Sequence, residues 1–505
     1  MSAWQRWGYP VGLAGVFVVA IAARLGSSLK TAGGLFGLGN YDDGVHFAAA
    51  LGLVNGLMPY RDFLLLHPPG VALVMAPFAA LSWLIGEPWA MAAARVAWMV
   101  LGGVNAVLCA LVLRPIGRLA GLVAGMLYAL LFGAVYIEYT TLLEPPATTV
   151  LLVALVLTRL LGSGAGIGPR RYLLAGLLLG LSPVMKIWGV VAVLVVVGAI
   201  VARRGRRPAL ITLGGAVAAA TALCLPFFVS APGEMWRMVV VAQLGRRRAA
   251  VPLSERLNDI LGVHGWINGS PRWEPVTVAM LAIVLAALAI CLIRVELRVI
   301  GALLIAHGAI VLITPMWFLH YAGLTAAPIA LAVGAAVGVV IGWVARVAQL
   351  PWMPGLIGAI ALVCTTLLVI PLQRITFYSP SFPGRTLAAQ VTDQPGCFVT
   401  DFPMTLIQMN LLQRNLDRGC RLVVDIGGYS YYDVDSQYAD VSRRKNKDFQ
   451  RVLLDYYRSG TAVIPLRFST VAGYSKSTAR TVEKWPLLAK AGPYVIREPQ
   501  PAGAR

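Results

Sequence analysis

Charged residues are scarce in this sequence, at 13% of 505 residues, whereas soluble globular domains carry about 25%. Apolar residues instead form long runs, such as VGLAGVFVVAIAARL and VTVAMLAIVLAALAICLI. Each of these runs is long enough, or nearly so, to cross a bilayer as a helix. The composition therefore excludes an ordinary soluble enzyme and predicts a multi-pass membrane protein.

A convincing signal-peptide cleavage pattern is also missing. The N-terminus reads MSAWQRWGYP and continues directly into an apolar run. We therefore expect that run to be retained as the first membrane span.

Acidic residues are fewer than basic ones. The chain has 22 Asp and Glu against 42 Lys and Arg, which gives a net charge of +20. In a soluble protein such an excess would indicate a nucleic-acid partner. Here much of it lies in short loops between apolar runs, where the preference for basic residues on the cytoplasmic side explains it. We expect no nucleic acid among the partners.

Several familiar site motifs are absent. The sequence contains no HExxH, GxGxxG, P-loop or cysteine-based metal motif, so it predicts neither a zinc site nor a nucleotide site. Four of the six cysteines lie in apolar runs, where they behave as small apolar side chains. The other two, Cys397 and Cys420, lie in the polar C-terminal region and can form a disulfide if that region is outside the cytoplasm.

The placement of arginine predicts the topology. Arginines lie before the first apolar run and in the connections 114–118, 170–171, 203–207, 294–298 and 346. The positive-inside rule puts all of these on the cytoplasmic side, which requires about eleven spans and a cytoplasmic N-terminus. The expected spans are about 9–29, 90–113, 119–138, 145–161, 172–185, 187–202, 209–229, 276–293, 299–314, 320–345 and 353–371.

This topology predicts two domains in the cytoplasmic (inner) membrane: an all-α polytopic membrane domain, 1–371, and a small extracytoplasmic α/β domain, 372–505. The large loops 30–88 and 230–275 then face outward. Within the first loop, we expect the apolar segment 70–86 to lie in or dip into the outer surface. In the tail, CFVTDFP, RLVVDIGG, GTAVIPL and PYVIRE are typical of short strands and DFQRVLLDYYRSG of a helix.

Two adjacent carboxylates, Asp42 and Asp43, stand in the first outer loop just after the first span. Adjacent side chains do not share a helix face, so one carboxylate can do chemistry while the other orients a partner or a metal. A carboxylate in a part-apolar pocket can act as a general base. The alternative is structural, because Asp is also a favoured N-cap and the pair opens a helical segment.

Two further charged residues lie at the ends of apolar runs. Glu144 precedes a span in LLEPPATTVLL, where it either serves a site or interacts with the helix N-terminus. Lys186 stands alone in GLSPVMKIWGV between two short apolar stretches. Snorkelling to the surface is one interpretation of this lysine, and we favour a phosphate or carboxylate partner.

Other polar residues belong to the same expected outer face. The run QLGRRRAAVPLSER holds Arg246, Arg247 and Arg248, which form either a solvated loop or a site for lipid phosphate. His67 and His320 are weaker signals, since histidines at such positions are often structural hydrogen-bonding groups. His46 and Tyr321 complete the set of candidates.

The arrangement resembles the GT-C superfamily of integral-membrane glycosyltransferases. It is most similar to the protein O-mannosyltransferases and the lipid A aminoarabinose transferases. The motif DDGVHF (42–47) resembles the acidic pair, followed by a surface helix, in the first external loop of these enzymes. The motif LEP (143–145) resembles a later acidic-Pro element, and MK (185–186) resembles a buried lysine in a short hairpin. LHPP (66–69) falls where members carry a charged or polar residue before proline.

The chain departs from these enzymes in three ways. Asp43 stands where Glu is common, and His67 stands where the aminoarabinose transferases have Lys. The β-rich insertion of the eukaryotic O-mannosyltransferases is missing. The segment DRGCRLVVDIGGYSYY resembles actinobacterial members, which use decaprenyl-phosphate sugars to build envelope glycans.

The resemblance implies an inverting sugar transfer on the outer face of the membrane. The donor would be a polyprenyl-phosphate mannose or arabinofuranose, and the acceptor a hydroxyl of an envelope glycan or glycolipid. Asp42 would act as the base, and Asp43, the second catalytic candidate, would hold the acceptor or a divalent ion. The remaining roles are donor-phosphate binding by Lys186, Arg246, Arg247, Arg248 and His67, and acceptor or metal binding by Glu144, His46, His320 and Tyr321. A divalent cation is the one cofactor that this interpretation allows.

Two other functions fit the same composition. A transporter or flippase of a lipid-linked sugar would also gather charged groups along its path, but the sequence has no repeated halves with matching broken helices. A non-catalytic envelope assembly protein would use the external tail to bind its partners. Carboxylates have the same sequence signature whether or not they take part in catalysis, so this alternative stays open.

Overall fold

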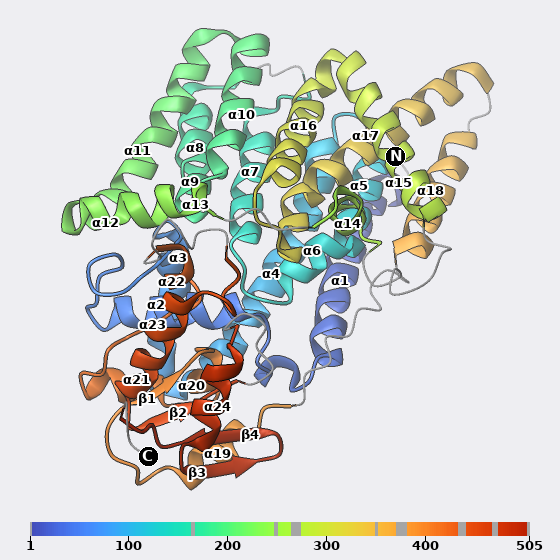
Figure 1. Cartoon of the computed structure of the whole chain (residues 1–505). Helices are drawn as coiled ribbons and strands as arrows, with labels where there is room; N and C mark the ends of the chain where they lie inside the picture. Colours follow the sequence, from blue (N-terminus) through green and yellow to red (C-terminus); the bar gives the residue numbers. More distant parts are fainter. Residues whose placement is uncertain are drawn as a thin grey trace. The chain divides into compact units, whose positions relative to one another are not determined.

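The computed structural model describes residues 3–162, 167–246, 251–263, 274–348, 352–369, 381–432, 441–466 and 473–501. These residues are mainly helical (Figure 1). The first helices are α1 (Ala3–Lys30), α2 (Tyr41–Val54), α3 (Gly70–Ile85), α4 (Glu87–Leu113), α5 (Arg118–Leu130), α6 (Phe132–Glu138), α7 (Glu144–Thr158), α8 (Pro169–Leu179), α9 (Leu181–Met185), α10 (Gly189–Arg204) and α11 (Arg206–Ser230).

The helices that follow are α12 (Pro232–Trp236), α13 (Ala242–Leu244), α14 (Leu253–Ile260), α15 (Glu274–Ile293), α16 (Arg298–Ile313), α17 (Gly323–Ala348) and α18 (Met353–Val369). A π-helical stretch, Arg237–Val241, joins α12 to α13. The C-terminal helices are α19 (Gly384–Gln390), α20 (Met404–Gln408), α21 (Leu412–Asp417), α22 (Tyr429–Tyr432), α23 (Lys447–Arg458) and α24 (Lys476–Lys484).

Among the described residues, six helical segments are long and apolar enough to cross a membrane. They are Gly8–Lys30, Glu87–Leu113, Arg206–Ser230, Pro275–Ile293, Val295–Ile313 and Leu319–Val347. The pair α5 and α6, bent by 58°, makes a seventh if it counts as one span. The chain is therefore an integral membrane protein. Other expected spans coincide with shorter helices such as α7, α10 and α18, so a total of about eleven stays a prediction.

The chain folds into two compact units. The first unit combines Met1–Ser28, Val96–Leu223 and Ala249–Thr376, and the second combines Leu29–Arg95, Cys224–Arg248 and Phe377–Arg505. A division at residue 371, as the sequence predicts, would leave 29–95 and 224–248 with the membrane spans. The structure instead groups them with the C-terminal segment. Most of the loop residues expected to face outward thus fold together with the tail.

Small side chains line the contact between α5 and α17 in the first unit. Helix α17 packs along α5, with Gly334 and Gly338 of α17 against Ala120 and Ala124 of α5. Small residues let neighbouring membrane helices approach closely, which increases their van der Waals contact. Helix α18 also packs on α5, and α15 and α16 pack on α17.

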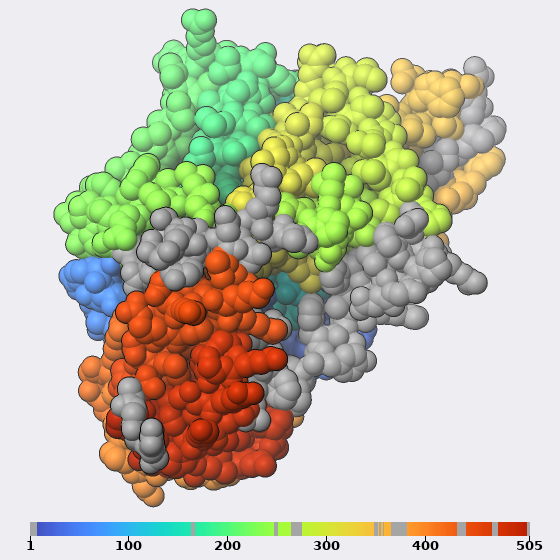
Figure 2. Space-filling model, in the orientation of Figure 1, coloured from blue at the N-terminus to red at the C-terminus, as the bar shows by residue number. Residues whose placement is uncertain are grey.

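The second unit contains a four-stranded sheet. Its strands are β1 (Phe398–Thr400), β2 (Ala462–Ile464), β3 (Leu487–Ala491) and β4 (Tyr494–Arg497), in the order β1-β2-β4-β3. Strands β1 and β2 are parallel, and the other two pairings are antiparallel. Helix α23 covers the sheet with Phe449 and Leu453, which pack with Val463 of β2. In the space-filling view the residues of this C-terminal region, in orange and red, form one compact body (Figure 2).

One strand prediction in the tail is wrong. Residues 421–428 form no strand, because the chain turns at Asp425. The carboxylate of Asp425 accepts a hydrogen bond from the backbone N–H of Gly428 at 2.8 Å, which stabilises a turn instead of an extended ladder. Strand β3, in contrast, was not predicted from the sequence.

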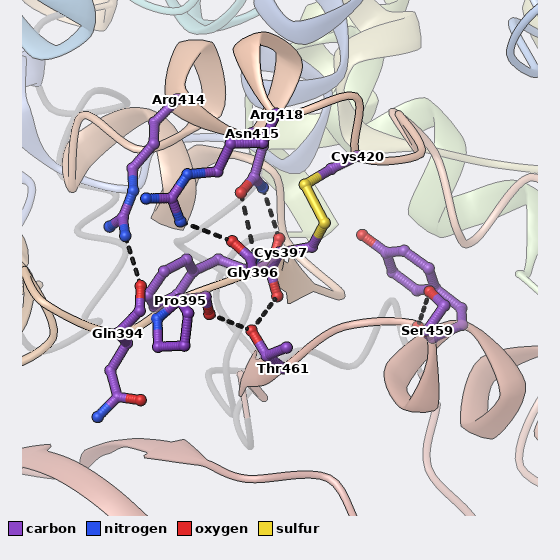
Figure 3. Close-up of a disulfide and its surroundings, with 12 residues drawn as sticks. Gln394, Pro395, Gly396, Cys397, Arg414, Asn415, Arg418, Cys420, Ser459 and Thr461 are labelled. Carbon is purple, nitrogen blue, oxygen red and sulfur yellow. Dashed lines mark hydrogen bonds between the residues drawn. A yellow bond between two sulfur atoms is a disulfide. The ribbon is translucent and has the colours of Figure 1, made fainter.

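A disulfide joins Cys397, beside β1, to Cys420, which follows α21 (Figure 3). It closes a loop with a sequence separation of 23 residues. Asn415 of α21 strengthens the same connection, since its side chain accepts a hydrogen bond from Phe398 N at 3.1 Å and donates one to Phe398 O at 2.6 Å. The loop that carries α20 and α21 is thereby tied to the edge of the sheet.

Asp401, directly after β1, is buried at the end of the two parallel strands. Its carboxylate accepts hydrogen bonds from Leu466 N at 2.9 Å and from the Tyr474 hydroxyl at 2.7 Å. Burial nevertheless dominates and raises the pKa of Asp401 from 3.8 to about 6.

This raised pKa predicts a pH-dependent stability. The folded state favours protonated Asp401, so its contribution is fully present below pH 3.8 and is lost as the pH rises through about 6. The unfolding free energy of the second unit should therefore rise by up to about 3 kcal/mol between pH 7 and pH 4 from this group. Hydrogen exchange at β1 and β2, corrected for intrinsic rates, measures it in the full chain. Asp401→Asn should flatten the dependence; an unchanged slope would contradict the assignment.

Candidate active site

The acidic pair lies in the first turn of α2, in the second unit. The N-cap of this helix is Asn40, whose side chain accepts a hydrogen bond from Asp42 N at 3.0 Å. Asp42 and Asp43 therefore do not cap the helix, and the structural alternative considered for them from the sequence is wrong. Both carboxylates lie where the helix dipole favours negative charge.

Asp43 is completely buried and paired with Arg95 of α4. The Arg95 Nη2 lies 3.1 Å from the Asp43 Oδ2, and the Arg95 Nη1 donates to the carbonyl oxygens of Leu35 at 2.7 Å and Gly37 at 2.9 Å. Gly39 makes this arrangement possible. Its φ is +63°, and a Cβ at this position would clash with the Arg95 guanidinium.

Asp42 differs from its neighbour in burial. It is only half-buried, whereas Asp43 is 0% exposed. A fully buried carboxylate held by an arginine is poorly placed to meet a substrate, because it is enclosed by protein and already engaged in an ion pair. Asp43 thus anchors the turn through its ion pair, whereas Asp42 is partly exposed.

Two histidines of the segment between α1 and α3 lie close together. The rings of His46, in α2, and His67 are 6.2 Å apart and nearly perpendicular. His46 is 1% exposed, and the backbone carbonyl of His67 accepts a hydrogen bond from the Tyr60 hydroxyl at 2.7 Å. The structure thus brings together two residues that the sequence assigned to different roles, acceptor or metal binding and donor-phosphate binding.

The first unit holds a second polar cluster, centred on Glu144 and Lys186. Glu144 is the first residue of α7, and Lys186 lies in the break between α9 and α10. The Lys186 Nζ is 2.6 Å from the Glu144 Oε1, so the expected carboxylate partner of this lysine is Glu144. The second oxygen of Glu144, Oε2, is buried without a hydrogen-bond partner among the described residues.

Aromatic rings surround the Lys186 ammonium. It lies 4.4 Å from the ring centroids of both Trp188 and Tyr321, distances at which a cation is attracted to the ring face. The Trp188 and Tyr321 rings are themselves 4.7 Å apart, edge to face. His320 lies 4.7 Å from Tyr321 and stacks on Phe318. An ion pair lined by aromatic rings can bind both the polar and the apolar surface of a ligand.

Buried hydrogen bonds hold the loop before Glu144. Glu138, at the end of α6, pairs with Arg24 and accepts hydrogen bonds from Asn105 at 2.9 Å and Tyr128 at 2.7 Å. Asn105 also accepts a hydrogen bond from the Thr149 hydroxyl at 2.7 Å. In addition, Trp98 Nε1 donates to Leu142 O at 2.8 Å. The path from α6 to α7 is therefore fixed at several points.

The arginine run is described only in part. The guanidinium of Arg246 lies 5.2 Å from the ring centroid of Tyr431, in α22, and that of Arg443 lies 5.3 Å from the same ring. Arg247 and Arg248 lie outside the described residues. Within the part of the chain that the structure describes, no group of three or more His, Cys, Asp or Glu side chains is arranged to hold a metal ion.

Comparison by sequence finds no relatives: no protein-family model matches the chain, and no curated protein is similar to it. Comparison by structure does. The chain is similar to ArnT from Cupriavidus metallidurans bound to undecaprenyl phosphate, with a TM-score of 0.58 and 13% identity over 99% of both chains. The apo form of ArnT matches with a TM-score of 0.58 and 14% identity over 98% of both chains.

A second solved structure agrees. The oligosaccharyltransferase AglB from Archaeoglobus fulgidus, in complex with an inhibitory peptide and a dolichol-phosphate, matches with a TM-score of 0.57 and 11% identity. The match covers 92% of this chain and 70% of AglB. The chain has the GT-C fold. At these identities the likeness shows the fold alone, and the GT-C fold extends over nearly the whole chain.

Sequence reasoning missed three residues that support these polar clusters. Arg24, Arg95 and Glu138 are each buried and ion-paired, yet they were treated as ordinary members of predicted spans. A signal for them was present, since an ionisable residue inside an apolar run is costly and usually has a partner. Asn40 was missed because the two acidic residues after it are also favoured helix caps.

The pairing of Asp43 with Arg95 predicts a strong, coupled effect on stability. Arg95→Met leaves a buried carboxylate without its cation, which should lower the unfolding free energy by about 3–5 kcal/mol. Adding Asp43→Asn should recover much of this loss, because the unpaired charge is then removed. Thermal unfolding in detergent measures both variants. Arg61→Met, which breaks the exposed pair with Asp62, is the control and should cost less than about 1 kcal/mol. Additive losses at positions 43 and 95 would refute the coupling.

Proposed function

We propose that the chain is a glycosyltransferase that moves a sugar from a polyprenyl-phosphate donor to a hydroxyl group. The GT-C fold, shared over nearly the full length with ArnT, supports this proposal. The ArnT structure contains undecaprenyl phosphate, and the AglB structure contains a dolichol-phosphate. Both ligands join a phosphate to a long apolar chain, which is the kind of donor that a membrane protein with polar clusters can bind.

The observation that carries the proposal is the difference in burial between the two adjacent acidic residues. Asp43 is buried against Arg95, while Asp42, the preceding residue of the same turn, is half-buried. The anchored neighbour gives the first turn of α2 a defined geometry, and a general base needs such a geometry to meet its substrate. Asp42 is therefore the proposed base.

The proposed reaction is a single displacement at the anomeric carbon. The acceptor hydroxyl gives its proton to Asp42 while its oxygen forms a bond to the anomeric carbon. The bond from that carbon to the phosphate oxygen breaks at the same time, and its electron pair leaves with the polyprenyl phosphate. Attack opposite to the leaving phosphate inverts the configuration of the sugar.

The cluster around Lys186 is proposed to bind the donor. The ammonium has three N–H donors, and the contact with Glu144 at 2.6 Å needs only one of them. The others are suited to a phosphate oxygen, whose growing negative charge they would stabilise. The second oxygen of Glu144 is suited to accept a hydrogen bond from a sugar hydroxyl, and the rings of Trp188 and Tyr321 to pack against the sugar. Arg246 is a further proposed phosphate contact.

The proposed location is the outer face of the cytoplasmic membrane, with the second unit outside the cell. The disulfide between Cys397 and Cys420 supports this side, because disulfides persist in oxidising compartments. Mannose and arabinofuranose are the proposed sugars, a decaprenyl phosphate the proposed carrier, and an envelope glycan or glycolipid the proposed acceptor.

The role of Asp42 is tested by transfer from radiolabelled decaprenyl-phospho-mannose to a membrane glycolipid extract, with the purified full chain in detergent. Decaprenyl-phospho-arabinofuranose is the second donor. Asp42→Asn should lower kcat about 100- to 10,000-fold, because the proton acceptor is lost.

Asp62→Asn is the matched control for Asp42→Asn. Asp62 lies in the same outer loop, and its hydrogen bond from Arg61 lowers its pKa, so it also is a carboxylate at neutral pH. This variant should keep the wild-type rate. A wild-type rate in folded Asp42→Asn would exclude Asp42 as the base, and no transfer by the wild-type chain with either donor would count against the proposed function.

The donor-binding role predicts a different kinetic effect for Glu144→Gln. The substitution keeps the size of the side chain but weakens its hydrogen bonds, so the donor KM should rise about tenfold or more while kcat changes less. Initial rates at varied donor concentration measure both constants. Glu296→Gln is the control, since this carboxylate of the same unit pairs with Arg294 at 2.6 Å in an exposed position. An unchanged donor KM in the Glu144 variant would remove Glu144 from the donor site.

A further inference from the structure

Tyr41 directly precedes the proposed base, Asp42, and is hydrogen-bonded to Asp425 in the C-terminal segment. Its hydroxyl donates a hydrogen bond to the Asp425 Oδ1 at 2.9 Å and accepts one from Gly427 N at 3.3 Å. Burial raises the pKa of the Tyr41 hydroxyl well above its usual value, so this group keeps its proton and remains a donor. The first turn of α2 is thus tied to the turn at residues 425–428.

That turn is itself firmly held. The Asp425 carboxylate accepts a second hydrogen bond, from Gly428 N at 2.8 Å. Arg443 donates to Gly427 O at 3.0 Å and to the Ser430 hydroxyl at 2.9 Å. These hydrogen bonds fix the position of the Asp425 carboxylate. The hydrogen bond from Tyr41 to this carboxylate therefore restrains the first turn of α2.

Packing around the same helical turn leaves little room for movement. A Cβ at Gly44, two residues after Asp42, would lie 2.6 Å from the backbone nitrogen of Met404 in α20. The rings of Tyr41 and Phe402 are 5.3 Å apart, edge to face. Backbone from the C-terminal segment therefore lies directly against the turn that carries both acidic residues.

We propose that Tyr41 and Asp425 are positioning residues, which orient the first turn of α2 so that Asp42 meets the acceptor hydroxyl. Neither residue is assigned a contact with substrate. This inference rests on the proposed function, since it assumes that Asp42 is the base. It adds a part for the C-terminal segment in placing that base for the transfer step. A misplacement of a base by about 1 Å can cost on the order of 100-fold in rate, so loss of this hydrogen bond should lower kcat more than it changes substrate binding.

The test uses Tyr41→Phe and Asp425→Asn, singly and together, in the full chain. Tyr41→Phe removes one hydroxyl and keeps the ring against Phe402. Tyr41→Phe should lower kcat about 10- to 100-fold, with the acceptor KM changed less than about threefold. Asp425→Asn should have a smaller effect, because the Asn amide oxygen still accepts the hydrogen bond but without the charge that strengthens it. The double variant should be no slower than Tyr41→Phe, because the hydrogen bond that Asp425→Asn weakens is already lost when the hydroxyl is removed. Hydrogen exchange should also be faster at the backbone amides of residues 41–44.

Tyr474→Phe is the matched control, since it removes a tyrosine-to-aspartate hydrogen bond of the same unit, to Asp401. It should cost similar stability while leaving kcat near the wild-type value. Equal losses of kcat in this control and in Tyr41→Phe, or independent effects of Tyr41→Phe and Asp425→Asn, would overturn the positioning role.

Hydrogen exchange separates this inference from the proposed function. If the wild-type chain transfers no sugar, the proposed function fails. The exchange of residues 41–44 in Tyr41→Phe then still decides whether Asp425 holds the turn. Unchanged exchange would overturn the inference, and faster exchange confined to these residues would support it.

Discussion

A charge buried among apolar helices is costly unless an opposite charge lies within hydrogen-bond distance. This constraint explains how the buried charged side chains of the chain are arranged. Among the described residues, three ion pairs have both side chains less than a tenth exposed: Arg24 with Glu138, Arg95 with Asp43, and Lys186 with Glu144. Each pair joins residues distant in the sequence, so each also fixes one helix or loop against another. The first supports the loop before Glu144, the second anchors the first turn of α2, and the third forms the centre of the polar cluster of the first unit.

The same constraint explains how far the sequence could predict the site. Asp42, Asp43, Glu144 and Lys186 border apolar runs, where an ionisable side chain is conspicuous, and all four lie in the polar clusters of the structure. Their partners were harder to find. A buried pair needs one residue from each of two distant segments, and nothing local in a sequence says which arginine meets which carboxylate.

Side-chain hydrogen bonds within turns also limited how much of the fold the sequence could predict. The sequence of residues 421–428 indicated a strand, but the side chain of Asp425 accepts a hydrogen bond from Gly428 N, and the chain turns there. The helical character of the membrane part, by contrast, follows from long apolar runs, because a helix satisfies its own backbone groups in lipid. Composition was enough for that step. The grouping of residues 29–95 with the C-terminal segment depends on distant contacts, such as the hydrogen bond from the backbone N–H of Gln413 to the Glu87 carboxylate.

The hydrogen bond between Tyr41 and Asp425 spans 384 residues of sequence, and this separation matters during biosynthesis. A ribosome adds about 5–20 residues per second, so the chain around Asp425 emerges roughly 20 to 80 s after Tyr41. The early apolar segments have entered the membrane by then, while the turn that holds the acidic pair still lacks its distal partner. A product truncated or stalled before Asp425 would therefore carry the acidic residues without their mature geometry, so the nascent protein completes its acidic turn only after the segment around Asp425 has been synthesised.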